Sequence, residues 1–260
     1  MTGTAPVISL QVDGLSLRVA QRTLIRAVSL LVRPGDLWCV LGANGAGKTL
    51  FLHTLAGLRR IDDGAVAMAG KPLAEWSLAD AARVRGFLPQ SLYHAFPMPV
   101  DEAVAMGRHP HLSRWAWERD DDRRRALAAL AEVGMAEYAR RDITTLSGGE
   151  RQRVAVAALL VQDVPLLLLD EPVAHLDLHH QIVVLRHLAQ LAAAGRGVML
   201  SIHDLNLARR FATHALLFRC DGHVDTGPVD AVMTEAALSE AFSCPVSRVT
   251  AGAHELFVAD

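Results

Sequence analysis

The feature that most constrains this chain is a glycine-rich octapeptide, 42–49, between an apolar run and a segment with helical spacing. Its letters, GANGAGKT, fit the pattern G-x-x-x-x-G-K-[ST]. The apolar run 37–41 is typical of a strand buried on both faces, and residues 49–58 have the spacing of a helix. A strand, loop and helix in this order direct backbone N–H groups and a helix N-terminus at one anion. The octapeptide therefore predicts a phosphate-binding loop in an α/β fold.

Two side chains of the octapeptide have specific expected roles. Lys48 is expected to bridge the β- and γ-phosphates of a nucleotide, and the Thr49 hydroxyl to bind Mg²⁺. Lys48 and Lys71 are the lysines of the chain, which otherwise uses arginine. A compact point charge is thus kept where a phosphate cradle needs one. The candidate phosphate-binding residues are Gly42, Ala43, Asn44, Gly45, Ala46, Gly47, Lys48 and Thr49.

A second apolar run, 164–169, ends in two carboxylates, Asp170 and Glu171. A buried strand would deliver them to the carboxyl edge of a parallel sheet, where ligands bind in open α/β folds. Neighbouring residues on a strand point in opposite directions, so the two carboxylates are expected to differ in role. We expect Asp170 to bind Mg²⁺ and Glu171 to act as the general base on the attacking water.

The rest of the chain predicts one sheet-containing core interrupted by helices. Segment 197–202 repeats the buried-strand pattern, which favours a parallel sheet with crossover helices. Strand patterns are absent from about Gln90 to Ala158, which indicates an inserted helical lobe. An N-terminal sheet is predicted from strands at 7–12, 15–20 and 28–32, and the lobe from helices at 101–106, 120–133 and 149–160.

The pentapeptide LSGGE at 146–150 distinguishes this chain from other phosphate-loop proteins. Ser147, Gly148 and Gly149 begin an amphipathic helical segment, so a hydroxyl, bare N–H groups and a helix dipole would form a second phosphate-binding tip. With the phosphate loop and the Asp-Glu strand in this order, essentially the whole chain resembles the ATP-binding-cassette family. The resemblance implies an α/β fold, with a P-loop NTPase (RecA-like) parallel sheet core, an N-terminal antiparallel β subdomain and an inserted helical subdomain.

The resemblance also implies the cofactors and the assembly. ATP and Mg²⁺ are the expected cofactors, and the tip at Ser147 is expected to complete the site of the opposite subunit. Two ATP molecules would then lie between two head-to-tail copies in a homodimer. Residues 1–260 would form a single domain, in which 1–89 and 159–260 are the catalytic core and 90–158 the helical subdomain.

Three further positions match the pattern of the family. Gln90 falls where a glutamine contacts Mg²⁺ and the attacking water, and Asp177 falls in the loop that crosses the dimer interface. His203 falls where a histidine contacts the γ-phosphate and helps to hold the catalytic geometry. The resemblance therefore makes Glu171, His203 and Gln90 the catalytic candidates, and Thr49, Gln90 and Asp170 the candidates for binding Mg²⁺.

One position departs from the family pattern. Cassettes usually carry an aromatic residue that stacks on adenine, and the spacing puts that place near Val19, with no aromatic residue nearby. We therefore expect weaker base stacking than is usual and poor discrimination between ATP and GTP.

Two segments resemble importers of iron complexes, haem and cobalamin, and most of all their haem-importing branch. They are 91–111, which in the family docks a permease helix, and 238–246. Haem is the expected cargo, with ferric siderophore second and cobalamin third. The resemblance implies two integral-membrane permease subunits and a periplasmic substrate-binding protein as partners. It places the chain peripherally at the cytoplasmic face of the inner membrane. We expect the cargo to be held by the permease, so His109 and His111 are expected to serve docking rather than haem ligation.

Charge and hydropathy argue against other classes of protein. The formal charge is −2 and no block of five like charges occurs, so no nucleic-acid partner is expected. No apolar run approaches the roughly 20 residues that span a bilayer, and residues 1–6 lack the pattern of a signal peptide. The alternatives are a soluble cassette ATPase of DNA repair or translation, and the ATPase subunit of an exporter. The chain lacks the zinc modules and coiled-coil arms usual in the first, and the importer-like segment 91–111 argues against the second.

Overall fold

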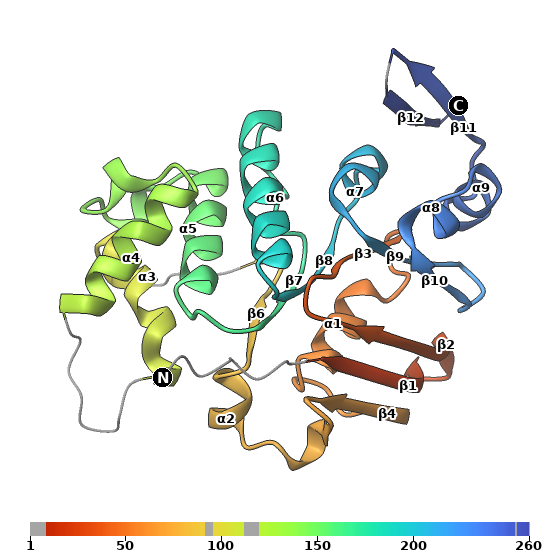
Figure 1. The fold of residues 1–260 in the computed structure, drawn as a ribbon, viewed down its shortest axis with the longest axis horizontal. Helices are drawn as coiled ribbons and strands as arrows, with labels where there is room; N and C mark the ends of the chain where they lie inside the picture. Colours follow the sequence, from red (N-terminus) through yellow and green to blue (C-terminus); the bar gives the residue numbers. More distant parts are fainter. Residues whose placement is uncertain (1–8, 92–95, 112–119, 253, 260) are drawn as a thin grey trace.

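A six-stranded sheet forms the centre of the computed structural model, which describes residues 9–91, 96–111, 120–252 and 254–259 (Figure 1). The strand order is β10-β9-β3-β8-β7-β6. Neighbouring strands are parallel except at the β9–β10 edge, so the predicted parallel core is confirmed. The strands are β3 (Leu37–Gly42), β6 (Arg85–Leu88), β7 (Leu166–Leu169), β8 (Gly197–Ser201), β9 (His214–Phe218) and β10 (Val224–Pro228).

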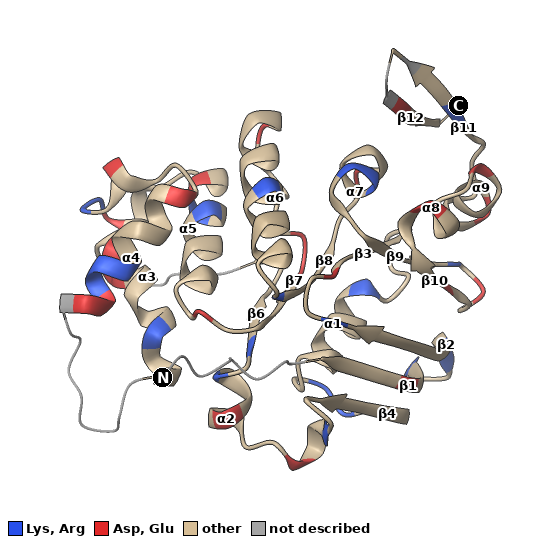
Figure 2. Ribbon diagram, viewed as in Figure 1, with Lys and Arg blue, Asp and Glu red and all other residues tan. Residues whose placement is uncertain are grey.

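Both faces of this sheet are buried at its centre, because alternate residues of β3, β7, β8 and β9 enter different apolar clusters. In β7, Leu167 and Leu169 belong to one cluster, and Leu166 and Leu168 belong to the other. The first cluster contains residues of α6 (Leu178–Ala193) and α7 (Leu205–Phe211), and the second contains residues of α1 (Lys48–Leu55). In Figure 2 the ribbons of β3, β8 and β9 carry neither acidic nor basic residues. This two-sided burial explains why the strands read as unbroken apolar runs.

A smaller antiparallel sheet packs on the α1 side of the core, as predicted. Its order is β2-β1-β4-β5. The prediction of separate strands at 7–12 and 15–20 is wrong, because the described residues form one strand, β1, whose register shifts around Gly14. Gly14 has a φ of 59°, so it forms a bulge within the strand rather than a break. The strands are β1 (Leu10–Val19), β2 (Arg22–Val32), β4 (Asp63–Met68) and β5 (Lys71–Pro72).

Helix α1 is shorter than the predicted segment 49–58. It ends at Leu55, and Gly57 follows with a φ of 68°, in the left-handed region typical just beyond a helix C-terminus. Four short helical elements accompany the two sheets: η1 (Leu73–Glu75), α2 (Leu78–Ala82), α8 (Val229–Val232) and α9 (Glu235–Phe242).

Between Gln90 and Ala158 the described residues contain helices and a single isolated bridge, Pro99 to Asp142, but no strand. This agrees with the predicted helical insertion, which forms a group of helices beside the sheet in Figure 1. The elements are α3 (Val100–Ala105), η2 (Met106–His111), α4 (Asp120–Glu132), η3 (Ala136–Tyr138), η4 (Ile143–Thr145) and α5 (Gly148–Leu160). The subdomain limits at residues 90 and 158 stay a prediction.

The C-terminal part forms a hairpin that the sequence did not predict. Strands β11 (Val246–Ala251) and β12 (His254–Ala259) pair with each other and project beyond α7 (Figure 1). Asn206 of α7 fixes β12, because its side chain bonds to both the N–H and the carbonyl of Phe257. Within the described ranges, no helix has the length and hydropathy needed to cross a membrane.

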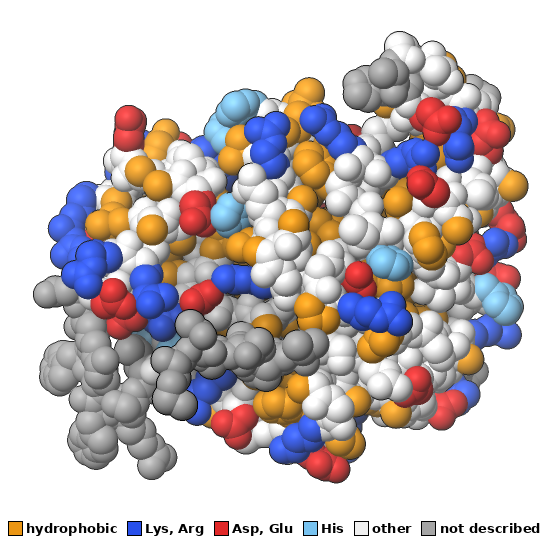
Figure 3. Space-filling model, in the orientation of Figure 1, with side chains coloured by type: hydrophobic (Ala, Val, Ile, Leu, Met, Phe, Trp, Pro, Cys, Tyr) orange, Lys and Arg blue, Asp and Glu red, His pale blue; other side chains and the backbone are white. Residues whose placement is uncertain are grey.

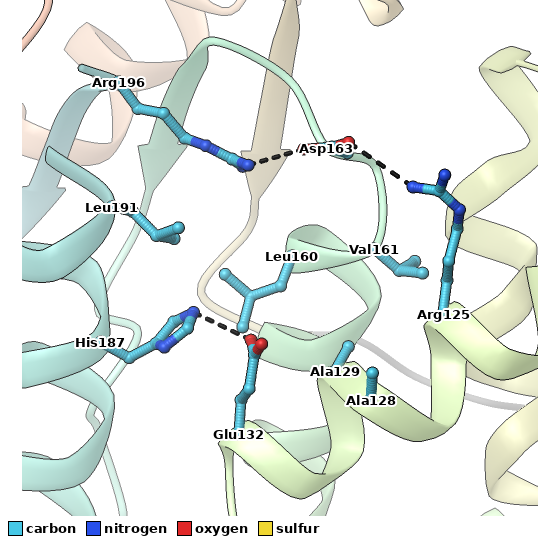
Figure 4. Close-up of a pocket in the computed structure, with 10 residues that line it drawn as sticks. All are labelled: Arg125, Ala128, Ala129, Glu132, Leu160, Val161, Asp163, His187, Leu191 and Arg196. Carbon is cyan, nitrogen blue, oxygen red and sulfur yellow. Dashed lines mark hydrogen bonds and ion pairs between the residues drawn. The ribbon is translucent and has the colours of Figure 1, made fainter. Parts of the chain in front are cut away.

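Ion pairs join the helical group to α6 across a cavity of about 230 Å³ (Figure 4). Asp163, in the loop after α5, contacts Arg125 of α4 at 3.6 Å and Arg196 at 2.6 Å. Glu132 of α4 contacts His187 of α6 at 3.0 Å. The side chains of Arg125, Asp163 and Glu132 are about half exposed, so these pairs add little free energy individually.

Inside the helical group, by contrast, the carboxylate of Asp101 is buried. Asp101 of α3 is 1% exposed and lies 2.9 Å from the Nη2 of Arg123 and 3.4 Å from the Nη1 of Arg140. It thereby connects α3 to α4 and to the residues after η3. A carboxylate at such a position is stabilised by these charged partners, because water is excluded from it.

We predict that Asp101→Asn lowers the free energy of unfolding by about 1–3 kcal/mol, since a charged acceptor of buried hydrogen bonds is lost. Asp121→Asn is the matched control, because Asp121 also pairs with two arginines but its side chain is 53% exposed. Urea denaturation should show a clear loss for the first variant and little change for the second. Equal losses would contradict the assignment of stability to burial.

Candidate functional site

The octapeptide forms a tight loop between β3 and α1. Gly42, Gly45 and Gly47 have φ values of 141°, 77° and 104°, which L-residues with side chains rarely adopt. A Cβ on Gly42 would also lie 2.8 Å from the carbonyl oxygen of Phe218, so β9 leaves no room for one. Gly47 is the N-cap of α1, which directs the N-terminus of that helix into the loop.

The ammonium group of Lys48 lies inside this loop. It donates to the carbonyl oxygens of Gly42 at 2.7 Å and Ala43 at 3.1 Å, and the residue is 6% exposed. Burial lowers the pKa of Lys48 below its ordinary value, while the negative charges of Glu171 and Asp170 oppose that shift. A phosphate placed at the loop would add further negative charge beside the same ammonium group.

Residues from four segments meet around one hollow of about 270 Å³. Asn44 to Leu50 supply its floor, and Gln90 and Glu171 line it from beyond β6 and β7. Leu24 of β2 completes the lining, and its Cβ would lie 3.5 Å from a Cβ on Gly47. The structure therefore brings the predicted phosphate loop, Gln90 and Glu171 together.

Asp170 follows β7 and is completely buried. Its Oδ1 accepts a hydrogen bond of 2.6 Å from the hydroxyl of Ser201, whereas its buried Oδ2 has no hydrogen-bond partner among the described residues. A buried carboxylate oxygen without a donor is costly unless a cation binds it. Carboxylate and hydroxyl oxygens are the ligands that Mg²⁺ prefers, so Asp170 and Thr49 fit a magnesium ion at the loop.

Glu171 departs from the strand geometry that the sequence predicted. Its φ is 51°, and the strand ends at Leu169, so alternation along a strand does not set its direction. The carboxylate contacts the Nε2 of His203 at 2.7 Å and the Nε2 of Gln90 at 3.1 Å. The three predicted catalytic residues thus form one hydrogen-bonded group at the lip of the hollow.

Ser147 begins α5 in a capping box. Its hydroxyl accepts from the N–H of Glu150 at 3.3 Å, and its own N–H donates to the Glu150 carboxylate at 2.7 Å. This second bond is the main reason that the pKa of Glu150 lies below its ordinary value. Ser147 and Gly148 are exposed, and within the described ranges no hydrogen bond or ion pair joins Ser147, Gly148 or Gly149 to the phosphate loop.

Asp177 is the N-cap of α6. Its carboxylate accepts from the N–H of His180 at 2.9 Å, and this bond is the main cause of its lowered pKa. The loop before Asp177 packs on the start of α5, because a Cβ on Gly149 would lie 3.0 Å from the carbonyl oxygen of His175. Contacts between the start of α5 and the loop before α6 therefore fix the positions of Asp177 and of residues 147–149. Neither belongs to the hydrogen-bonded group around Glu171.

Three residues of the site were missed by sequence reasoning. Ser201 ends β8 next to both carboxylates, Leu24 lines the hollow, and Gln152 of α5 donates to the carbonyl of Glu171 at 3.2 Å. Ser201 left a usable signal, since it is a polar residue at the end of an apolar strand. Leu24 and Gln152 left no such signal, because leucine is an ordinary residue for a strand and glutamine for a helix.

Comparison with known proteins agrees with this geometry. A family model described as "ABC transporter" matches residues 25–174. The chain is 40% identical over 235 residues to the hemin import ATP-binding protein of Streptomyces coelicolor, covering 90% of this chain and 82% of that protein. It is 37% identical over 243 residues to the iron(3+)-hydroxamate import ATP-binding protein of Bacillus subtilis, covering 93% and 90%.

Among solved structures, the chain is similar to an inward-facing ABC transporter of metal-chelate type. The TM-score is 0.84 at 27% identity, over 97% of this chain and 98% of that chain. Similarity over nearly the full length of both chains extends to the helical group and the C-terminal hairpin as well as the core.

We predict that the departure at Val19 weakens selection of the base, so that ATP and GTP bind with comparable affinity. Val19 ends β1 and is 47% exposed. Val19→Tyr should tighten ATP binding by about 1–3 kcal/mol, the usual contribution of stacking a base on an aromatic ring. Fluorescence titration with both nucleotides measures this, with Val249→Tyr, a 46% exposed position on the hairpin, as the control. A strong preference of the unaltered chain for ATP would refute the prediction.

Proposed function

This chain belongs to the ABC transporter family, and we propose that it is the ATP-hydrolysing subunit of an importer whose cargo is haem. The family resemblance predicted from the sequence is confirmed, and as a member of this family the chain binds ATP and is an ATPase. The observation that carries the site assignment is the Glu171 carboxylate at the lip of the phosphate hollow, bonded to both His203 and Gln90.

Hydrolysis follows from this arrangement. Glu171 accepts a proton from a water molecule, whose oxygen attacks the γ-phosphorus while the bond to the ADP oxygen breaks. His203 and Gln90 hold the carboxylate in position through their bonds to its two oxygens. Lys48 contributes positive charge that is already fixed within the loop, so little reorganisation accompanies the developing charge.

Asp170, Thr49 and Gln90 would hold Mg²⁺. The unpartnered Oδ2 of Asp170 supports this assignment. When bound, the ion neutralises charge on the β- and γ-phosphate oxygens.

A second copy of the chain completes the site in this proposal. Ser147, Gly148 and Gly149 offer a hydroxyl, a helix N-terminus and free space, since a Cβ on Gly148 would meet nothing within 4 Å. Ser147 and Gly148 are exposed at the start of α5, and within the described ranges none of the three residues bonds to the phosphate loop of its own chain. Two head-to-tail copies would place each tip on the ATP of the other, and Asp177 at the contact. ATP would then favour the closed homodimer, and hydrolysis would release it.

Two permease subunits are the proposed membrane partners. Four large apolar side chains are exposed on elements on either side of Gln90 in sequence: Leu58, Leu78, Phe96 and Met106. Arg83, just after α2, donates to the carbonyl of Pro110 at 2.9 Å, which holds α2 beside η2. These exposed apolar side chains are candidates for contact with the permease. The chain would sit peripherally on the cytoplasmic face of the inner membrane, beneath a permease served by a periplasmic substrate-binding protein.

The choice of haem rests on the relatives and on segments 91–111 and 238–246. The matched relatives include proteins named for hemin and for iron(3+)-hydroxamate import, so ferric siderophore is the second candidate and cobalamin the third. Residues 92–95 of the first segment lie outside the described residues. His111 contacts the carbonyl oxygen of Gln162 at 2.6 Å, which supports a structural role rather than haem ligation.

A soluble cassette ATPase that acts on nucleic acid is a weaker alternative. On the face shown in Figure 3, acidic and basic side chains are interspersed, whereas a polynucleotide site needs an extended basic surface.

We predict that Glu171→Gln lowers the ATPase rate of the assembled transporter about 10²–10⁴-fold, the usual contribution of a general base. ATP affinity should be retained, and the variant should elute as an ATP-stabilised dimer in size-exclusion chromatography. Glu137→Gln, an exposed change in the helical group, is the control. Normal turnover by the Glu171 variant would refute the assignment of the base.

The cargo is tested by ATP-driven uptake into vesicles that contain the chain with its own permease and binding protein. We predict uptake of haem and weaker or no uptake of a ferric siderophore or cobalamin. The Glu171→Gln variant, whose ATPase rate should be strongly reduced, gives the background uptake in the same vesicles. Uptake of the siderophore or of cobalamin without haem would replace the proposed cargo while leaving the ATPase assignment unchanged.

A further inference from the structure

A single buried hydroxyl contacts both carboxylate residues of the phosphate site. The Oγ of Ser201 donates to the Oδ1 of Asp170 at 2.6 Å and accepts from the backbone N–H of Glu171 at 2.8 Å. Ser201 and Asp170 are both completely buried. The two bonds use the donor of the hydroxyl and one of its acceptor sites, so the hydroxyl orientation is fixed.

The first bond decides which oxygen of Asp170 is available. With Oδ1 occupied by Ser201, the buried Oδ2 is the carboxylate oxygen without a partner among the described residues. Rotation of the carboxylate out of its present plane would break the 2.6 Å bond. Ser201 thereby fixes the orientation of the carboxylate and leaves one of its oxygens available to a cation.

The second bond holds an unusual backbone. Glu171 has a φ of 51°, a left-handed conformation that costs free energy for a residue with a side chain and persists only when its surroundings fix it. The Ser201 hydroxyl is one such support, and the carbonyl of Glu171 receives another from Gln152. This backbone directs the Glu171 carboxylate to His203 and Gln90.

We propose that Ser201 is a positioning residue, which acts through Asp170 and Glu171 to orient the metal-binding oxygen and the general base together. The inference rests on the proposed roles of Asp170 and Glu171. A small hydroxyl is suited to this position, because β7 and β8 are adjacent parallel strands that pair Leu169 with Leu200. Asp170 and Ser201 are the next residue along each strand, and an apolar side chain in place of Ser201 would leave both bonds unmade.

The test measures metal binding separately from turnover. The affinity of the purified full chain for a non-hydrolysable ATP analogue is determined with Mg²⁺ and with EDTA, and the ratio gives the enhancement due to the metal. Ser201→Ala should lower this enhancement about 10- to 100-fold, the usual effect of losing a residue that orients a metal ligand. The affinity in EDTA should stay within about twofold of the unaltered chain, because the loop is untouched. Mn²⁺ titration followed by EPR should show the same loss directly.

Two further variants make the test decisive. Ser201→Thr keeps the hydroxyl and should retain most of the enhancement, and Ser201→Cys should lose part of it, which carries the test if the alanine variant does not fold. Thr54→Val is the matched control, since Thr54 is also completely buried and its hydroxyl donates to the Leu50 carbonyl within α1, its one partner among the described residues. An unchanged enhancement in Ser201→Ala, or an equal loss in Ser201→Thr, would overturn the proposal.

Asp170→Asn separates failure of this inference from failure of the proposed function. If Asp170→Asn abolishes the enhancement while Ser201→Ala leaves it intact, the metal site stands and the role of Ser201 is wrong. If Asp170→Asn has no effect, the proposed metal ligand is itself wrong.

Discussion

Backbone hydrogen bonds between β6, β7 and β8 set the positions on which the whole site depends. The parallel register pairs Leu88 with Leu169 and Leu169 with Leu200, so the three strands end level with one another. The N–H of Asp170 continues this pairing, since it donates to the carbonyl of Leu88 at 2.8 Å. Residues just beyond the strands therefore arrive at one edge of the sheet. A slip of one residue in any strand would turn those side chains to the opposite face.

How much of this site could be predicted from the sequence depends on how local each feature is. The phosphate loop was recognisable because its glycines and Lys48 lie in one continuous segment whose backbone only that composition allows. Ser201 stood out as a polar residue at the end of an apolar strand, but its role could not be assigned, because its partners Asp170 and Glu171 lie some thirty residues away and meet it only through strand pairing. The direction of Glu171 was also out of reach, since its left-handed backbone breaks the alternation used to predict it.

How well the fold could be predicted also depended on how local each feature is. The buried strands β3, β7 and β8 were predicted from unbroken apolar runs, whereas the sequence of β6 includes Arg85 and Gly86. That glycine marks close packing rather than a turn, because a Cβ there would lie 2.6 Å from the Cδ1 of Leu159. Gly14 led to the opposite error, because the sequence around it predicted a break between two strands where the structure has a bulge within β1. The local sequence alone cannot distinguish a glycine in close packing from one in a bulge or a turn, because the difference depends on the neighbouring element.

The contrast between the ion pairs inside the helical group and those at its edge has a mechanical consequence. Within the group, Asp101 is buried between two arginines, and Arg153 donates to the carbonyls of Val133 and Gly134. At the Figure 4 cavity, the side chains of Asp163 and Glu132 are about half exposed, and the ion pairs of Asp163 with Arg125 and Arg196 are screened by salt. The helices should thus hold their shape as a rigid body, with a compliant attachment to α6 on this side. Its stiffness would fall as ionic strength rises, without any loss of order within the helices themselves.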